Sequence, residues 1–150
     1  MDSKDRQILR ALQRNGRMTN LELAEEVSLS PSPCLRRLRN LESSGAITGY
    51  SAKVDPNTYG LPITAFVHVR LKQHDDETVK QFENRIQQLD EVLECFMLTG
   101  GTDYFLKVMV SGLDAYEEFI RNKLHKINDI GSIDTSFIYS VVKQTNVFPL

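Results

Sequence analysis

The sequence predicts an α+β protein with an N-terminal winged helix-turn-helix and a C-terminal ferredoxin-like βαββαβ unit. Residues 1–45 contain three short stretches of helical periodicity, and the last carries three arginines. From residue 63 the order of patterns is strand, helix, strand, strand, helix, strand. We therefore expect a helix-turn-helix domain over residues 1–50, a linker or strand over 51–62, and a second domain over 63–150.

The charge distribution supports this division. Residues 1–50 carry eight Lys/Arg and six Asp/Glu, whereas residues 63–150 carry nine and thirteen. The net charges are therefore +2 and −4 within a chain of net charge −2. Two parts of opposite sign indicate different partners, and the positive part is the candidate for nucleic acid.

The first two helices are predicted from their ends. Residues 1–16 have acids in the first turn, and Gly16 follows the last turn as a C-cap would. Residues 19–27 begin with Thr19 and Glu22 at capping-box spacing. The residues expected to face inward from this second helix are Leu21, Ala24 and Val27, with Leu23 beside them.

The third helix is predicted to begin at Ser30 or Ser32 and to end at Gly45. Prolines are tolerated in a first helical turn, and Pro31 and Pro33 mark that turn. Projection at 100° per residue turns Cys34, Leu38 and Leu41 inward, with Leu35 near the edge. The outward side chains are Ser32, Arg36, Asn40 and Ser43, flanked by Arg37 and Arg39.

This outward surface is basic and rich in hydrogen-bonding groups. Arginines attract phosphates, and the first residues of such a helix reach base edges in a major groove. A solvated arginine surface on a small three-helix domain explains the charge pattern equally well. The tight turn before the prolines favours the DNA interpretation.

The segment after the third helix allows two interpretations. Residues 47–54 are β-prone with Gly49 at a turn, so they are either the wing of a winged helix or a linking strand. The cluster DPNTYG, residues 55–60, is typical of a turn and marks the domain boundary.

The second domain has strands with apolar residues on both faces. The expected strands are 62–72, 91–100, 103–111 and 133–143, and the expected helices are 75–89 and 114–127. Two helices cover only one face of a four-stranded sheet, so the other face, which includes Phe66, needs a second cover. A second copy of the sheet is the simplest cover, and we therefore expect a homodimer.

Several classes of protein are not indicated. The chain has no apolar run of the ~20 residues that span a membrane and no apolar core of a secretion signal, so we expect a cytoplasmic protein. Cys34 and Cys95 match no metal or redox spacing, and His68, His74 and His125 share no metal spacing either. We expect no metal site, no cofactor and no enzymatic activity, because no phosphate loop or nucleophile constellation is present.

The chain resembles the Lrp/AsnC, or feast/famine, family of transcriptional regulators over nearly all of its length. Residues 5–56 are similar to the DNA-binding segment of the family, and LSPSPCLRRLRNLESSG, residues 29–45, matches its recognition helix. The run LTGGTDYFLKV, residues 98–108, resembles the glycine–Asp–Tyr loop of its amino-acid-sensing domain.

The resemblance implies a DNA-binding regulator whose assembly responds to an amino-acid effector bound between dimers. It implies homodimers that assemble further, often to an octamer, with double-stranded DNA wrapped around them. The implied DNA-binding residues are Ser30, Ser32, Pro33, Arg36, Arg37 and Arg39, and the outward Asn40 joins them. The implied effector-binding residues are Thr99, Gly100, Gly101, Thr102, Asp103 and Tyr104, with Thr135 from the last strand.

The chemistry of the glycine loop agrees with this role. Two glycines allow close approach of a ligand and offer N–H groups to a carboxylate, and Asp103 is placed to receive an ammonium group. The alternative is that GGTD only turns a hairpin. The nearby apolar residues Met97, Leu98 and Phe105 suggest leucine or methionine as the effector.

One alternative function belongs to a different class. A distant relative of the family decarboxylates a tetrapyrrole precursor on the same scaffold. The alternative is therefore an enzyme or sensor that no longer binds DNA.

Overall fold

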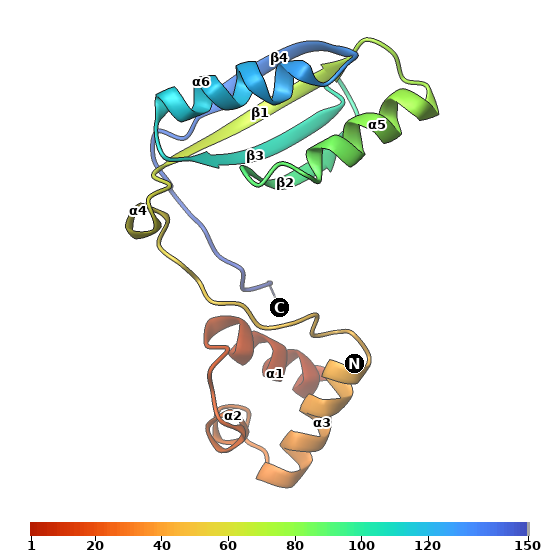
Figure 1. Ribbon diagram of the computed structural model, residues 1–150. Coiled ribbons are helices and arrows are strands. Elements are labelled where there is room, and N and C mark those ends of the chain that lie inside the picture. Colours follow the sequence, from red (N-terminus) through yellow and green to blue (C-terminus); the bar gives the residue numbers. More distant parts are fainter. Residues whose placement is uncertain (150) are drawn as a thin grey trace. The chain divides into compact units, whose positions relative to one another are not determined.

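The computed structural model describes residues 1–149, which fold as two compact units (Figure 1). The first unit contains residues 1–53 and the C-terminal segment from residue 142, and the second contains residues 54–141. No helix in the described part of the chain is long and apolar enough to cross a membrane.

Three helices form the first unit: α1 (Ser3–Arg14), α2 (Asn20–Glu26) and α3 (Pro31–Ser43). Both predicted N-termini are confirmed, because capping boxes are present at Asp2/Asp5 and Thr19/Glu22. Their apolar faces meet in one cluster of buried residues. Its members are Ile8, Ala11, Leu23, Ala24, Val27, Cys34 and Leu41.

Two local expectations for these helices are wrong. Leu21 is 58% exposed, whereas Leu23 is fully buried. Since α2 has only two turns, its buried stripe is Leu23, Ala24 and Val27, and Leu21 lies outside it. The helix α1 ends at Arg14 with Asn15 as its C-cap, one residue before Gly16.

The turn between α2 and α3 is closed by two backbone hydrogen bonds. Ser28 adopts a left-handed conformation with φ 53°. Its N–H donates to Glu25 O at 3.1 Å, and the Leu29 N–H donates to Ala24 O at 2.9 Å. This is a Schellman motif with serine where glycine is usual, and Leu29 packs on the cluster beneath it. The motif fixes the direction in which α3 leaves the turn.

The end of α3 is as predicted. Gly45 has φ 75°, and its N–H donates to Glu42 O at 3.1 Å. The β-prone residues 47–54 pair with no strand in the part of the chain that the structure describes. The turn cluster after them forms the short helix α4 (Pro56–Tyr59), capped by Asp55 and ended by Gly60 at φ 90°.

The C-terminal segment belongs to the first unit through α1. The Gln13 side chain donates from Nε2 to Asn146 O at 2.7 Å and accepts at Oε1 from the Phe148 N–H at 3.0 Å. The Arg10 guanidinium donates to Phe148 O at 3.4 Å. One amide side chain thus binds two backbone groups of the chain end.

The second unit is a four-stranded antiparallel sheet in the order β2-β3-β1-β4. This is the predicted ferredoxin-like arrangement. The strands are β1 (Ile63–Leu71), β2 (Val92–Met97), β3 (Tyr104–Val110) and β4 (Ile130–Phe137). The helices are α5 (Asp76–Ile86), α6 (Leu113–Asn122) and the 3-10 turn η1 (Leu124–Lys126).

The last strand ends six residues earlier than predicted. Its final pair is Phe137 with Ala65, and the Ile138 N–H donates to Thr64 O at 3.1 Å. The next residue back along β1 beyond Ile63 is Pro62, which has no N–H to donate. The apolar residues Tyr139 and Val141 therefore lie outside the ladder and are exposed.

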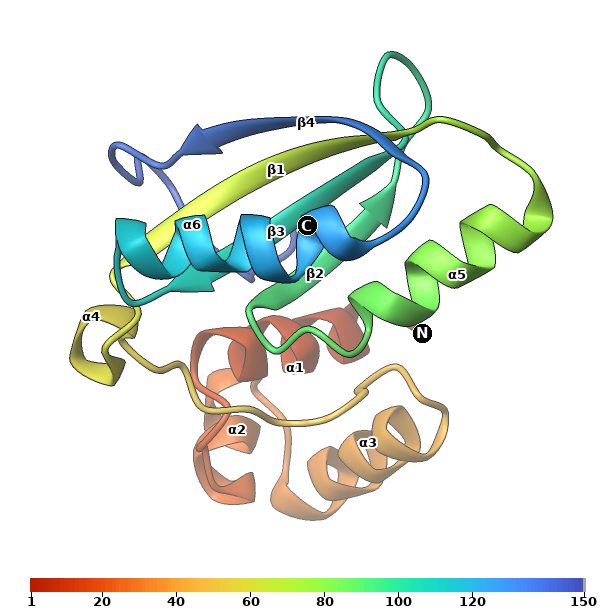
Figure 2. The ribbon, with the colours of Figure 1, turned by 45° about the horizontal axis from the view of Figure 1, so that its top comes forward.

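The two helices cover one face of the sheet (Figure 1 and Figure 2). Alternate residues of β1 and β3 turn toward them and are buried, including Val67 and Leu106. The opposite face carries the predicted Phe66, whose ring lies 4.9 Å from that of Phe105. Phe105 also contacts the ring of His68 at 5.1 Å, and Phe96 lies 6.4 Å away. This aromatic face has no cover within the described chain.

We expect Ser28→Val to lower the free energy of unfolding of the first unit by about 1–2 kcal/mol, because a β-branched residue is strained in the left-handed conformation. Ser28→Gly removes the same hydroxyl but suits that conformation, so it should cause no such loss. Urea unfolding followed by circular dichroism measures both variants. Equal losses in the two would mean that the serine hydroxyl, rather than the backbone, stabilises the turn.

Candidate DNA-binding face and effector loop

The outward face of α3 is exposed as predicted. Arg36, Arg39 and Asn40 are solvent-exposed, whereas Cys34 is fully buried and Leu41 nearly so. Neither Arg36 nor Arg39 forms an ion pair within the described residues. Their guanidinium groups are free to meet phosphates, the groups that supply most non-specific affinity for DNA.

The start of α3 presents hydroxyl groups. Ser30 is the N-cap but makes no side-chain capping bond, and Pro31 and Pro33 have no N–H. Ser32 alone among the first three helical residues keeps its backbone N–H, and both serines are exposed. This end of the helix offers short polar side chains of the type that contact phosphates and base edges.

Asn20 fastens the start of α2 to the start of α3, a role that the sequence analysis missed. Its Nδ2 donates to Pro31 O at 2.9 Å, and its buried Oδ1 has no partner among the described residues. An asparagine in a first helical turn gives no sequence signal for a contact eleven residues away. The bond fixes the angle at which the hydroxyl-rich end of α3 leaves the turn.

Arg37 differs from its two neighbouring arginines. Its Nη1 lies 2.7 Å from Asp2 Oδ2 and 2.7 Å from Asp5 Oδ1, both at the start of α1. The hydrogen bonds that the guanidinium donates to Asp5 and, next in effect, to Asp2 raise its pKa. The backbone N–H of Asp5 and the Arg37 guanidinium lower the pKa of the Asp2 carboxyl. Arg37 is thus committed to carboxylates of its own domain.

The glycine loop joins β2 to β3 at the end of the sheet where β1 also ends (Figure 2). Gly100 has φ 123°, a conformation that favours glycine, and Gly101 is exposed. The Leu98 N–H donates to Asp103 O at 2.8 Å, which closes the loop. Arg70 donates to the carbonyl of Gly101. The exposed glycines leave backbone groups accessible to a ligand.

Asp103 is bound from both sides within the chain. Its Oδ2 accepts from the Leu71 N–H at 2.7 Å, and its Oδ1 lies 2.9 Å from Nε2 of His74. Partial burial opposes ionisation, but the Leu71 N–H, His74 and Arg70 together hold the pKa of the Asp103 carboxyl below its ordinary value. The Asp103 carboxylate therefore holds the loop against the end of β1. Any contact with a ligand is additional to this role.

Tyr104 and Thr135 lie apart from the loop glycines within one chain. The Tyr104 ring is 2% exposed and packs 4.5 Å from Phe82, while its hydroxyl donates to Glu83 Oε1 at 2.9 Å. Burial and then Glu83 raise the pKa of the Tyr104 hydroxyl strongly. Thr135 lies on β4, where its hydroxyl is 2.5 Å from that of Tyr116. Only residues 99–103 of the predicted effector set are brought together by the loop itself.

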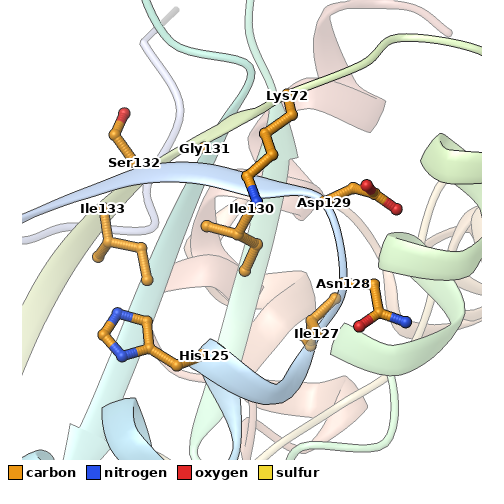
Figure 3. Close-up of a pocket in the computed structure, with 9 residues that line it drawn as sticks. All are labelled: Lys72, His125, Ile127, Asn128, Asp129, Ile130, Gly131, Ser132 and Ile133. Atoms are coloured by element: carbon orange, nitrogen blue, oxygen red, sulfur yellow. The ribbon is translucent and has the colours of Figure 1, made fainter.

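A small pocket opens at the same end of the sheet, between Lys72, η1 and the start of β4 (Figure 3). Its volume is about 240 Å³. The Lys72 side chain reaches toward Ile130, with His125 and Ile133 at one end of the pocket and Asn128 at the other (Figure 3). The pocket is smaller than the ~300–1,000 Å³ of sites for drug-sized ligands. It combines a cation with apolar side chains.

Metal binding has no support in this region. Within residues 1–149, no group of three or more His, Cys, Asp or Glu side chains is arranged to hold a metal ion. Both cysteines are free thiols, Cys34 buried and Cys95 exposed on the sheet. Desolvation by the surrounding protein atoms, followed by the charge of Glu83, raises the pKa of Cys95 to about 11.

The fold and these two surfaces define a class of protein, a DNA-binding regulator with a separate ligand-sensing domain. The profile of a winged helix-turn-helix DNA-binding domain matches residues 1–48, and that of the Lrp/AsnC ligand binding domain matches residues 64–148. The chain belongs to the Lrp/AsnC family of transcriptional regulators.

Individual relatives resemble this chain over nearly its full length. The leucine-responsive regulatory proteins of Klebsiella pneumoniae and Escherichia coli are each 36% identical over 146 residues, which is 97% of this chain and 89% of theirs. A transcriptional regulator of Neisseria meningitidis, solved as a complex with L-methionine, is 38% identical with a TM-score of 0.95, covering 99% of this chain and 96% of its own. Escherichia coli AsnC is 30% identical with a TM-score of 0.89, covering 99% of both chains.

We expect Asp103→Asn to lower the stability of the second unit by about 1 kcal/mol at neutral pH, since it removes a charged acceptor that is partly screened by solvent. A carboxyl whose pKa is lower in the folded state stabilises above its unfolded pKa of ~3.9, and this stabilisation is lost as the pH falls through the folded value. The difference between wild type and variant should therefore vanish in acid.

Urea unfolding at a series of pH values measures this difference. Glu118→Gln, an exposed acid on α6 without an ion pair in the described chain, is the matched control. A loss for Asp103→Asn that is the same at every pH would show that the carboxylate charge does not hold the loop.

Proposed function

We propose that the exposed face of α3 lies in the major groove of double-stranded DNA. Arg36 and Arg39 contact phosphates, and the side chains of Ser30, Ser32 and Asn40 reach base edges, with Pro33 packed against the backbone. The observation that carries this proposal is the pair of exposed arginines without carboxylate partners in the described chain, on a helix whose other face is buried. Acids surround the third arginine but neither of these two.

We further propose a homodimer formed through the aromatic face of the sheet. Phe66, Phe96 and Phe105 form a contiguous apolar surface there, and an ion pair of 2.8 Å between Lys107 and Glu94 lies beside it. Apolar clusters rimmed by polar residues are typical of obligate interfaces. Dimers place two α3 helices on one duplex, and assembly to an octamer extends the DNA contact.

The effector is proposed to be leucine or methionine, bound at the glycine loop. The N–H groups of residues 99–102 are the donors for its carboxylate. A relative of similar structure was solved with L-methionine, which supports an amino acid of this size. Since both oxygens of Asp103 already have partners, its contact with the ammonium group is shared with His74. Tyr104 supports the loop from the core, and Thr135 is supplied by a neighbouring subunit.

The effector acts by binding one assembly more tightly than another. A ligand shifts an equilibrium only by its difference in affinity for the two states. A coupling of about 1–3 kcal/mol changes DNA affinity about 5–150-fold.

In this proposal the protein is not an enzyme, needs no cofactor and works in the cytoplasm, where chromosomal DNA and free amino acids meet. The pocket beside Lys72, at about 240 Å³, is too small for a tetrapyrrole and gives no support to the alternative function.

We expect Arg36→Gln and Arg39→Gln each to weaken DNA binding and to flatten its salt dependence. Each lost phosphate contact reduces the slope of log K against log salt by about 0.9. Fluorescence anisotropy with a duplex selected from a random pool measures the slope, and sedimentation should show an unchanged oligomer. Arg121→Gln, on α6 and paired with Glu117, is the control. Unchanged slopes in both α3 variants would remove this face from the DNA contact.

We expect Gly101→Val to abolish the response to the effector. L-methionine or L-leucine at a hundred times its dissociation constant should stabilise the wild type by about 2.7 kcal/mol in a thermal-shift measurement. Gly101 has no strained φ, and an added Cβ meets only Arg70 Nη2 at 3.9 Å, so the variant should fold. Gly112→Val, at the start of α6, is the control. A full response in Gly101→Val would place the ligand elsewhere.

A further inference from the structure

The first turn of α1 brings two carboxylates together. In its capping box, Asp2 Oδ1 accepts from the Asp5 N–H at 2.9 Å, and Asp5 Oδ2 accepts from the Asp2 N–H at 2.8 Å. Each carboxylate uses one oxygen in this exchange and has one oxygen left. A capping box usually pairs a hydroxyl with an acid, whereas this one holds two negative charges side by side. A cation beside the two carboxylates reduces the repulsion between them.

Arg37 supplies that cation from the middle of α3. Its Nη1 donates to the remaining oxygen of each carboxylate, Asp2 Oδ2 and Asp5 Oδ1, at 2.7 Å. Asp5 and Arg37 are only partly accessible, with side-chain exposures of 16% and 32%. The contact spans 32 residues of sequence and joins α1 directly to α3.

The same turn of α1 also holds the turn that precedes α3. The Lys4 ammonium group donates to the carbonyl of Val27, the C-cap of α2. Residues of the first turn of α1 thus make contacts at two points. Lys4 contacts the turn between α2 and α3, and Asp2 and Asp5 contact α3. Together they fix both the position and the rotation of α3.

The local charge argues against a DNA contact by Arg37. The two carboxylates offset the positive charge of the Arg37 guanidinium, which leaves it little attraction for phosphate. Arg36 and Arg39 flank Arg37 in the sequence, are exposed, and have no carboxylate partner in the described chain.

We propose that Arg37 is a positioning residue, which locks α3 to the start of α1 so that Arg36 and Arg39 meet the DNA backbone, and that it does not contact DNA itself. This inference rests on the proposed use of α3 in DNA binding. It divides the three arginines of one helix into two that bind the partner and one that orients the helix.

Asp5→Asn gives the first test, because the two roles predict opposite signs. If Arg37 positions α3, weakening its clasp lowers affinity for the selected duplex several-fold. If Arg37 binds phosphate, releasing it and removing a negative charge raises affinity. Glu25→Gln neutralises an exposed acid of α2 and measures the effect of charge alone. Affinity above that of Glu25→Gln would overturn the proposal.

The salt dependence of DNA binding gives the second test. A variant that changes only the stability of the protein keeps the same slope of log K against log salt. We expect Arg37→Gln to weaken binding several-fold with the salt slope unchanged, whereas Arg39→Gln reduces the slope by about 0.9. Asp5→Asn added to Arg37→Gln should cause no further loss, because both remove one clasp. Should Arg37→Gln fail to fold, the comparison of Asp5→Asn with Glu25→Gln, in which Arg37 is kept, decides between the two roles.

The outcomes separate this inference from the function on which it rests. A wild-type protein that binds no duplex, or binds with no salt dependence, overturns both. A steep wild-type slope that Arg37→Gln flattens as much as Arg39→Gln overturns the positioning role and leaves DNA binding by α3 intact.

Discussion

The second unit is governed by the uneven covering of its sheet. The helices α5 and α6 bury one face, and the described residues 54–141 of this unit include no further element that buries the other. Aromatic rings of three strands meet on that second face, where exposure to water is costly. A single copy of this chain leaves these rings without cover from α5 and α6. In the proposed dimer, pairing of two sheets covers this face and, in the same step, brings the DNA-binding units together in pairs.

The sensing loop is stabilised by interactions that do not involve the ligand. Asp103 binds the end of β1 and His74, and Arg70 binds the loop carbonyl of Gly101. A loop already ordered in this way loses little conformational entropy when a ligand arrives. In the proposed site, the ligand then has the backbone of the glycines as its main new partner. Recognition of this kind suits the carboxylate and ammonium groups that all amino acids share, and leaves selectivity to the surroundings of the side chain.

Patterns local in sequence predicted most of the fold. The capping box at Thr19, the prolines at α3 and the alternation in β1 each depend on residues within a few positions of one another, and all are present as expected. The errors also have local causes. A two-turn helix contains too few residues to define its buried stripe, so Leu21 was misassigned. The end of β4 depends on where its antiparallel partner β1 begins, which an apolar run in β4 itself does not reveal.

The candidate sites were less predictable because their partners are distant in sequence. Projection of α3 predicts the correct outward face, but all three of its arginines were assigned to the DNA contact. Only the fold brings Arg37 to Asp2 and Asp5. Likewise, the sequence GGTD indicated a loop with one free acid, and the structure brings His74 and the Leu71 N–H to that acid. Ion pairs between residues that are distant in sequence become visible only in the tertiary structure. In the sequence alone, any of several acids is an equally good partner for a given arginine.

The amide of Gln13 has a consequence for how the DNA-binding unit is isolated. Its two hydrogen bonds are made with Asn146 and Phe148, which lie beyond the whole second unit in sequence. A fragment cut after the third helix lacks these partners, and water must replace them along one side of α1. The smallest faithful version of this unit is therefore discontinuous: it consists of the first 53 residues together with a peptide from the opposite terminus.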